Sequence, residues 1–80
     1  PNGEQGVTEA PTLSYDRAGK VVLSSETDGA SIAYRVKGEG DWLLFTASTV
    51  LRAGVLYEAM AHRIGNKKSA TVELRLDVPR

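Results

Sequence analysis

"LYEAMAHR", residues 56–63, decides whether this chain is all-β or mixed, because its composition and its pattern point in different directions. Leu, Glu, Ala and Met favour helices. The side chains nevertheless alternate, and on a strand one face would carry Tyr57, Ala59 and Ala61, the other Glu58, Met60 and His62. A segment this short is also too short for a helix that is stable without tertiary packing. We therefore predict a strand.

The segments on either side support the same prediction, because short apolar or alternating runs are separated by turn residues. These runs are residues 12–15, 20–25, 31–37, 42–46, 48–51 and 70–78. The clearest alternation places Ile32, Tyr34 and Val36, and then Val72, Leu74, Leu76 and Val78, toward a core. Short strands with turn signals every 8 to 12 residues or so are typical of an antiparallel two-sheet sandwich. We predict an all-β sandwich of six or seven strands, with 48–51 as a short edge strand.

Length and composition limit the remaining possibilities. Eighty residues make one domain with a thin core. Ten basic residues balance ten acidic ones, so we expect neither a nucleic-acid nor a membrane partner. Cysteine is absent, which excludes disulfides and thiolate chemistry. We expect residues 1–10 to be a linker from an upstream catalytic domain and residues 11–80 to be the sandwich, within a fragment of a longer protein that starts without Met.

The titratable residues do not form a catalytic pattern. The single histidine, His62, shares a face with Glu58 and could act with it as a base or metal ligand, but a solvated surface histidine is the simpler interpretation. A metal site usually needs three or four good ligands. The carboxylates Asp28, Glu39 and Asp41 lie in or beside turns, where short polar side chains bond to local backbone. We predict no catalytic residue, metal ligand or cofactor in this chain.

The aromatic residues raise one binding hypothesis. They include Tyr34, Phe45 and Tyr57, which we expect to fill the core because aromatic side chains bury the most area. Trp42 follows a charged turn and could be partly exposed, so that its ring could stack on a sugar. With the nearby basic residues Arg35 and Lys37, it makes the set of candidate glycan contacts.

Three segments together resemble a known family. They contain Gly29, Ala30, Ile32 and Tyr34, then Trp42, Phe45 and Thr46, and then Ala59, Ala61, Arg63, Ile64, Gly65 and Ser69. In this order they resemble the C-terminal module of many bacterial sulfatases, which is similar to the Fn3-associated and chitobiase C-terminal families of Ig-like sandwiches. The opening "PNGEQGVTEAP" resembles the lead-in of that module. The chain departs from the family after Phe45, where "TASTVL" replaces the common Thr-Gly-Pro-Ile.

The resemblance implies an Ig-like or fibronectin-III-like sandwich that is an accessory domain of a secreted or periplasmic sulfatase. Sulfatases use a formylglycine made within a Cys/Ser-x-Pro-x-Arg motif, together with calcium. This chain lacks that motif, so the catalytic domain and its calcium are expected upstream. The expected role is to pack against that domain and to stabilise or position it. The alternatives are a carbohydrate-binding module that holds a sulfated polysaccharide near a parent hydrolase, and a general cell-surface interaction domain.

Overall fold

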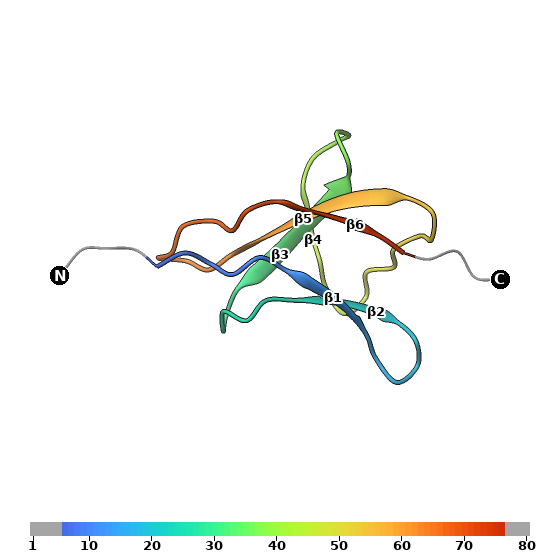
Figure 1. Ribbon diagram of the computed structural model, residues 1–80, viewed down its shortest axis with the longest axis horizontal. Helices are drawn as coiled ribbons and strands as arrows, with labels where there is room; N and C mark the ends of the chain where they lie inside the picture. Colours follow the sequence, from blue (N-terminus) through green and yellow to red (C-terminus); the bar gives the residue numbers. More distant parts are fainter. Residues whose placement is uncertain (1–5, 77–80) are drawn as a thin grey trace.

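The computed structural model describes residues 6–76, and within this range the chain forms six strands and no helix (Figure 1). The strands are β1 (Thr12–Tyr15), β2 (Val21–Ser24), β3 (Ser31–Val36), β4 (Leu43–Leu44), β5 (Leu56–His62) and β6 (Val72–Arg75). β1 and β2 make one antiparallel sheet, and the second antiparallel sheet has the order β4-β3-β5-β6. The predicted all-β fold of two antiparallel sheets is therefore confirmed, in the form of a small β-sandwich.

The ambiguous segment 56–63 forms β5, which lies between β3 and β6. Its burial alternates along the strand as the sequence predicted, with Tyr57, Ala59 and Ala61 buried and the residues between them half-buried. Ala59 and Ala61 are 0% exposed. Packing on this face therefore outweighs the helix propensity of Leu, Glu, Ala and Met.

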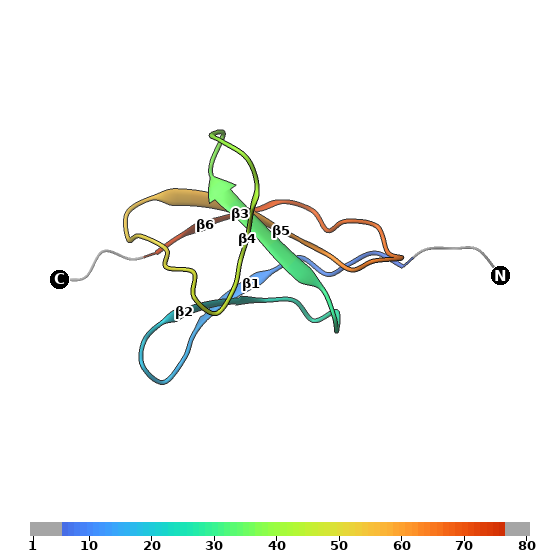
Figure 2. The same cartoon turned by 180° about the vertical axis from the view of Figure 1, so that it is seen from behind.

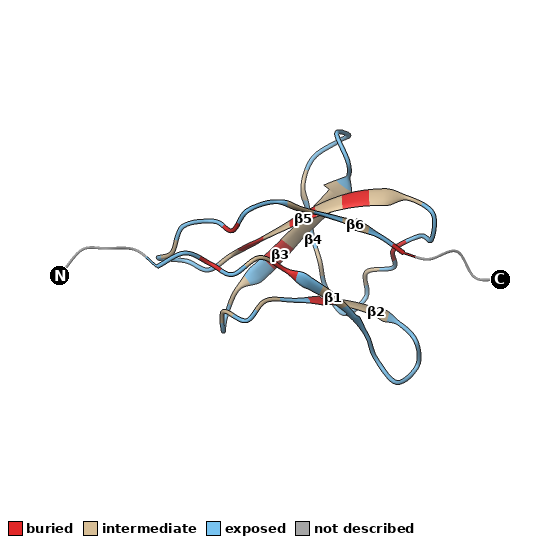
Figure 3. Ribbon diagram, viewed as in Figure 1, coloured by how far each residue is buried: buried red, intermediate tan, exposed pale blue. Residues whose placement is uncertain are grey.

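The core lies between the two sheets (Figure 3). Its buried hydrophobic residues are Leu23, Ile32, Leu51, Tyr57, Ala59, Ala61 and Leu76. Tyr34 packs edge-to-face against both Phe45 and Tyr57, with ring centroids 6.2 Å apart in each pair. The expectation that these three aromatic residues fill the core agrees with this cluster, although Tyr34 and Phe45 are only half-buried.

The predicted edge strand at residues 48–51 is wrong. The chain turns there instead, because Thr46 N–H donates to the Thr49 hydroxyl at 2.9 Å and Thr49 N–H donates to the Thr46 carbonyl at 3.0 Å. Threonine hydroxyls that bond to nearby backbone in this way compete with strand pairing. The segment after β4 then runs down to β2, as Figures 1 and 2 show from opposite sides.

Several strand boundaries also differ from the prediction. β4 covers only Leu43–Leu44 of the predicted 42–46, and β6 covers Val72–Arg75 of the part of 70–78 that is described, which ends at residue 76. Val36, predicted to face the core, is 37% exposed because it is the last residue of β3. Val78 lies outside the described residues.

The segment before Pro11, predicted as linker, is in part packed onto the sandwich. Thr8 is 1% exposed, and its N–H donates to the Lys67 carbonyl at 2.9 Å. Val7 makes a parallel bridge with Lys67. The backbone of residues 6–8 is therefore joined to the sandwich at Lys67, and Thr8 is buried there, whereas Val7 is 59% exposed.

Candidate binding surface

The register of β3 and β5 places opposite charges against each other on the outer face of the four-stranded sheet. Arg35 lies directly opposite Glu58, and Arg35 Nε donates to Glu58 Oε2 at 2.7 Å. The two side chains are 29% and 13% exposed, so the pair is shielded from much of the solvent. Directly opposed cross-strand residues of this kind are the closest side-chain neighbours that a sheet offers.

Glu58 accepts a second hydrogen bond from the turn that follows β3. The N–H of Gly38 donates to the same oxygen, Oε2, at 3.0 Å. Gly38 has φ of 74°, a left-handed conformation that glycine adopts without strain. The Gly38 N–H, followed by the Arg35 guanidinium, lowers the pKa of Glu58 below its usual value, since both stabilise the charged form. Glu58 is therefore an anionic acceptor that anchors a turn.

Arg35 connects this ion pair to Trp42. Its Nη1 donates to the Gly40 carbonyl at 3.1 Å, and its Cζ lies 4.6 Å from the centroid of the Trp42 ring. A guanidinium at this distance over an indole makes a cation–π contact. The structure therefore brings two of the three candidate glycan contacts together. It also places the Arg35 guanidinium over the ring of Trp42, so that one face of this half-buried side chain is already covered.

Lys37, the third candidate, is exposed and pairs with Glu73 of β6. The hydrogen bond to Glu73 is the main cause that raises the pKa of Lys37. Neither Glu58 nor Glu73 was recognised from the sequence as a partner of these cations. Only the register reveals them, because Arg35, Glu58 and Glu73 are consecutive neighbours across three strands.

His62 lies on β5, half-buried, with Nε2 at 3.0 Å from the Asn66 carbonyl. Its hypothetical partner Glu58 is held by Arg35 and Gly38 instead. Over residues 6–76, no group of three or more His, Cys, Asp or Glu side chains is placed to hold a metal ion.

A hollow of about 490 Å³ lies beside Arg35 at the C-terminal end of β3. Its lining comprises the apolar side chains of Tyr34, Val36, Leu43 and Tyr57, together with Arg35, Gly40 and the carboxylate residues Glu39 and Asp41. The surface therefore combines a partly covered indole, a cation and an apolar hollow with acidic residues in its lining. Its charged groups on the sheet are engaged with one another.

The chain is similar to an ulvan-active sulfatase from Formosa agariphila, with 31% identity over 75 residues that cover 88% of this chain. The chain spans only 12% of the length of that sulfatase. No family model matches the chain, and no solved structure matches it. The described residues include no helix that is long and apolar enough to cross a bilayer. The similarity thus relates the chain to a small part of a sulfatase.

Proposed function

We propose that this chain is a non-catalytic accessory domain of a larger sulfatase, an Ig-like sandwich that packs against the catalytic domain and stabilises or positions it. The observation that carries the proposal is the extent of the similarity. It covers most of this chain but only 12% of the ulvan-active sulfatase. Because sulfatases act on sulfate esters outside the cytoplasm in many bacteria, the proposed location is periplasmic or extracellular.

The contacts of the charged residues support a structural role. Arg35, Glu58 and Gly38 tie together β3, β5 and the turn between β3 and β4. Lys37, which directly follows β3, pairs with Glu73 of β6. In this proposal the formylglycine, its motif and the calcium ion belong to the catalytic domain of the parent protein.

The proposal is tested by comparing the parent sulfatase with a version that lacks this domain. We expect the melting temperature of the truncated protein to fall by several degrees, while the activity per folded molecule on a small sulfate ester is retained. An unchanged melting temperature would contradict the packing role. Loss of all activity in a protein that remains folded would contradict the non-catalytic role.

A second candidate function, binding of a sulfated polysaccharide, is favoured by one observation. Trp42 is only half-buried, and it lies next to Arg35 and beside the hollow lined by Tyr34 and Leu43. Sugars stack on such rings, and Arg35 and Lys37 could attract sulfate groups if their carboxylate partners released them. An NMR titration of the chain with sulfated oligosaccharides at millimolar concentration tests this. Shifts of the Trp42 indole N–H that the Trp42→Ala variant abolishes would support binding, and a spectrum without shifts would exclude it.

A further inference from the structure

One edge of β2 has no strand beside it. Asp16 N–H donates to the Lys20 carbonyl at 2.9 Å, which fixes the alternation of the β1–β2 ladder. In an antiparallel ladder every second residue directs its N–H and C=O to the partner strand. Val22 and Ser24 therefore face β1, whereas Val21 and Leu23 direct their backbone groups away from it. Among the described residues, no backbone hydrogen bond reaches Val21 or Leu23 from another segment.

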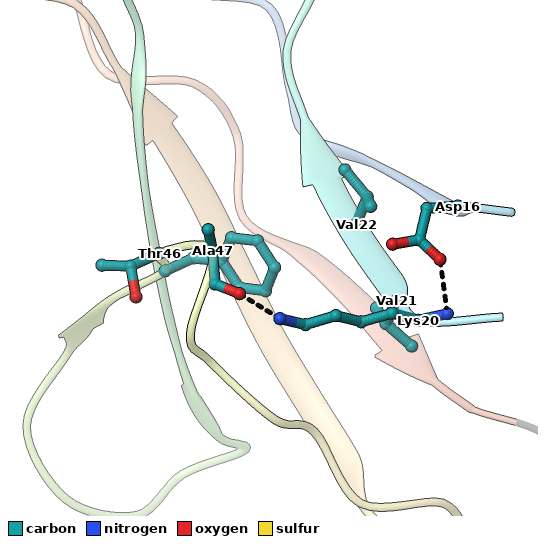
Figure 4. Close-up of a pocket in the computed structure, with 7 residues that line it drawn as sticks. Asp16, Lys20, Val21, Val22, Thr46 and Ala47 are labelled. Atoms are coloured by element: carbon teal, nitrogen blue, oxygen red, sulfur yellow. Dashed lines mark hydrogen bonds between the residues drawn. The ribbon is translucent and has the colours of Figure 1, made fainter. Parts of the chain in front are cut away.

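A line of hollows follows this free edge. The first, of about 340 Å³, is lined by Val21, Val22, Phe45 and Ala47 among others (Figure 4). The second, of about 450 Å³, is lined by Leu23, Ser24, Leu44 and Phe45 among others, so the two share Phe45. Successive side chains on a strand point to opposite faces. Hollows lined by two successive residues of β2 therefore lie at its edge, and together they form a groove along the strand.

A third hollow extends the groove past the beginning of β2. It has a volume of about 580 Å³ and shares Lys20 and Val21 with the first. Its further lining includes the exposed side chains of Tyr15 and Val50, which are 55% and 80% exposed, and the buried Leu51. The groove is thus mainly apolar beside Val21 and past the beginning of β2. The hollow beside Leu23 also has polar residues in its lining, among them Ser24, Ser25, Thr27, Asp28 and Ser31. Leu44 to Ala47 line its other side.

Lys20 is the one cation among the described residues that line the groove, whose lining also includes the carboxylate residues Asp16 and Asp28. Lys20 Nζ reaches across the hollow to the Ala47 carbonyl (Figure 4). No carboxylate lies within salt-bridge distance of Lys20 among the described residues. The nearby Asp16 carboxylate accepts instead from the backbone N–H groups of Ala18 and Lys20, each at 2.9 Å. A lysine on a free edge discourages indiscriminate pairing with other chains, and it also favours an incoming strand that carries a negative charge.

We propose that the free edge of β2 receives a single extended strand from the catalytic domain of the parent protein. This strand pairs with the backbone of Val21 and Leu23, and it carries a carboxylate side chain that faces Lys20. The inference rests on the proposed function, since it names the surface through which the accessory domain is attached. Added strands gain affinity from main-chain hydrogen bonds and specificity from pockets for alternate side chains. Residues 44–47 border the groove, so one strand fits there more readily than the edge of another sheet.

The test is amide hydrogen exchange at single-residue resolution, in the 80-residue chain and in the parent protein. In the isolated chain, we expect the amides of Val21 and Leu23 to exchange at least 10-fold faster than those of Val22 and Ser24. In the parent, their exchange should slow by 100-fold or more. Unchanged exchange at Val21 and Leu23 in the parent would overturn the inference. Equal protection of all four amides in the isolated chain would also overturn it, because the edge would then be occupied from within the chain.

Variants of the parent test the two parts of the proposal separately. Lys20→Glu should return the Val21 and Leu23 amides to fast exchange, because two carboxylates would then face each other. Val21→Pro removes a backbone N–H donor from the free edge of β2 and leaves the N–H groups that face β1 in place. It should also return the Leu23 amide to fast exchange. Arg17→Glu, in the same exposed turn, is the charge control and should change nothing. Circular dichroism establishes that each variant is folded.

The same experiments separate this inference from the proposed function. If deletion of the domain lowers the melting temperature of the parent but Val21 and Leu23 remain unprotected, the domain packs through another surface and the strand-addition inference is wrong. If deletion leaves the melting temperature unchanged and these amides are protected, the strand is added without the stabilising role. If neither effect is seen, both proposals are wrong.

Discussion

The hydroxyl of Thr8 accepts a hydrogen bond from the backbone N–H of Arg63 at 3.1 Å, across 55 positions of sequence. Thr8 is 1% exposed, and this part-buried bond joins the N-terminal segment to the residue that follows β5. Thr8→Val keeps the shape of the side chain and removes the acceptor. We expect a loss of about 1–3 kcal/mol in the free energy of unfolding, because the Arg63 N–H loses its partner. Urea denaturation measures the loss. Thr8→Ser, which keeps the hydroxyl, should lose less, and the reverse order would contradict the role of the bond.

Glu58 should make the stability of the domain depend on pH on the acid side. Its pKa is lower in the folded chain than its usual value of 4.5, because of the Gly38 N–H and then Arg35. A carboxyl of this kind binds protons more weakly in the folded protein than in the unfolded chain. Its contribution to the free energy of unfolding is therefore complete above the pKa of the unfolded state and is lost as the pH falls through the pKa of the folded state. We expect stability to drop below pH about 4.5, and Glu58→Gln to flatten that drop.

Urea denaturation between pH 3 and pH 6, or thereabouts, measures this dependence across the usual range of a glutamate pKa. Glu39→Gln is the matched control, since it removes a carboxylate from the turn that Glu58 anchors. The explanation fails if Glu58→Gln keeps the pH dependence of the original protein.

Arg35 and Lys37 should contribute unequally although both are paired cations. Arg35 contacts Glu58, the Gly40 carbonyl and the Trp42 ring, and its side chain is 29% exposed. Lys37 makes one ion pair, and its side chain is 48% exposed. Exposed pairs contribute little to stability and are screened by salt. We expect Arg35→Met to lower the melting temperature more than Lys37→Met. Only the first variant should also change the tryptophan fluorescence, and an equal effect of both would contradict this.

The centre of β5 should not tolerate larger side chains. Ala61 is 0% exposed, and its N–H donates to Ser69 Oγ at 2.8 Å. Extra methylene groups in a packed core cost about 1–3 kcal/mol through shifted backbone and side chains. We expect Ala61→Leu to destabilise the domain by about this amount, measured by thermal unfolding. Met60→Leu, at the neighbouring half-buried position, is the control and should have a smaller effect.

The sequence was sufficient to predict the strands whose alternation is regular. Residues 56–62 are the clearest case, because alternation at Tyr57, Ala59 and Ala61 described burial better than helix propensity did. The sequence was not sufficient at residues 48–51. The hydroxyl of Thr49 accepts a hydrogen bond within a turn there, and nothing in the order of apolar and polar residues indicates this turn. Strand propensity and the alternation of apolar and polar residues are local properties of the sequence. A side chain that hydrogen-bonds to nearby backbone overrides both of them over the same few residues.

The candidate binding surface was predicted only in part. Trp42 and Arg35 were recognised by residue type, and the structure brings them into contact. Their carboxylate neighbours were missed because they are distant in sequence. Glu58 is 23 positions from Arg35, and Glu73 is 36 positions from Lys37. Strand register, which the sequence alone does not specify, determines both pairs.

The long-range pairing of β3 with β5 also sets the order in which the domain can be completed during synthesis. Ser31 pairs with His62, and Thr8 bonds to the backbone of Lys67 and Arg63. Chains are made from the N-terminus, so these bonds must wait until the second partner has left the ribosome. The β1–β2 hairpin, whose partners span residues 12–24, and the β3–β4 pair, whose partners span residues 33–44, can both form early, before β3 has its β5 partner. Assembly of the domain on the ribosome is therefore late. The N-terminal segment waits for residues made more than fifty positions after it, and the pairing of β5 with β6 waits longer still, until Arg75 has been made.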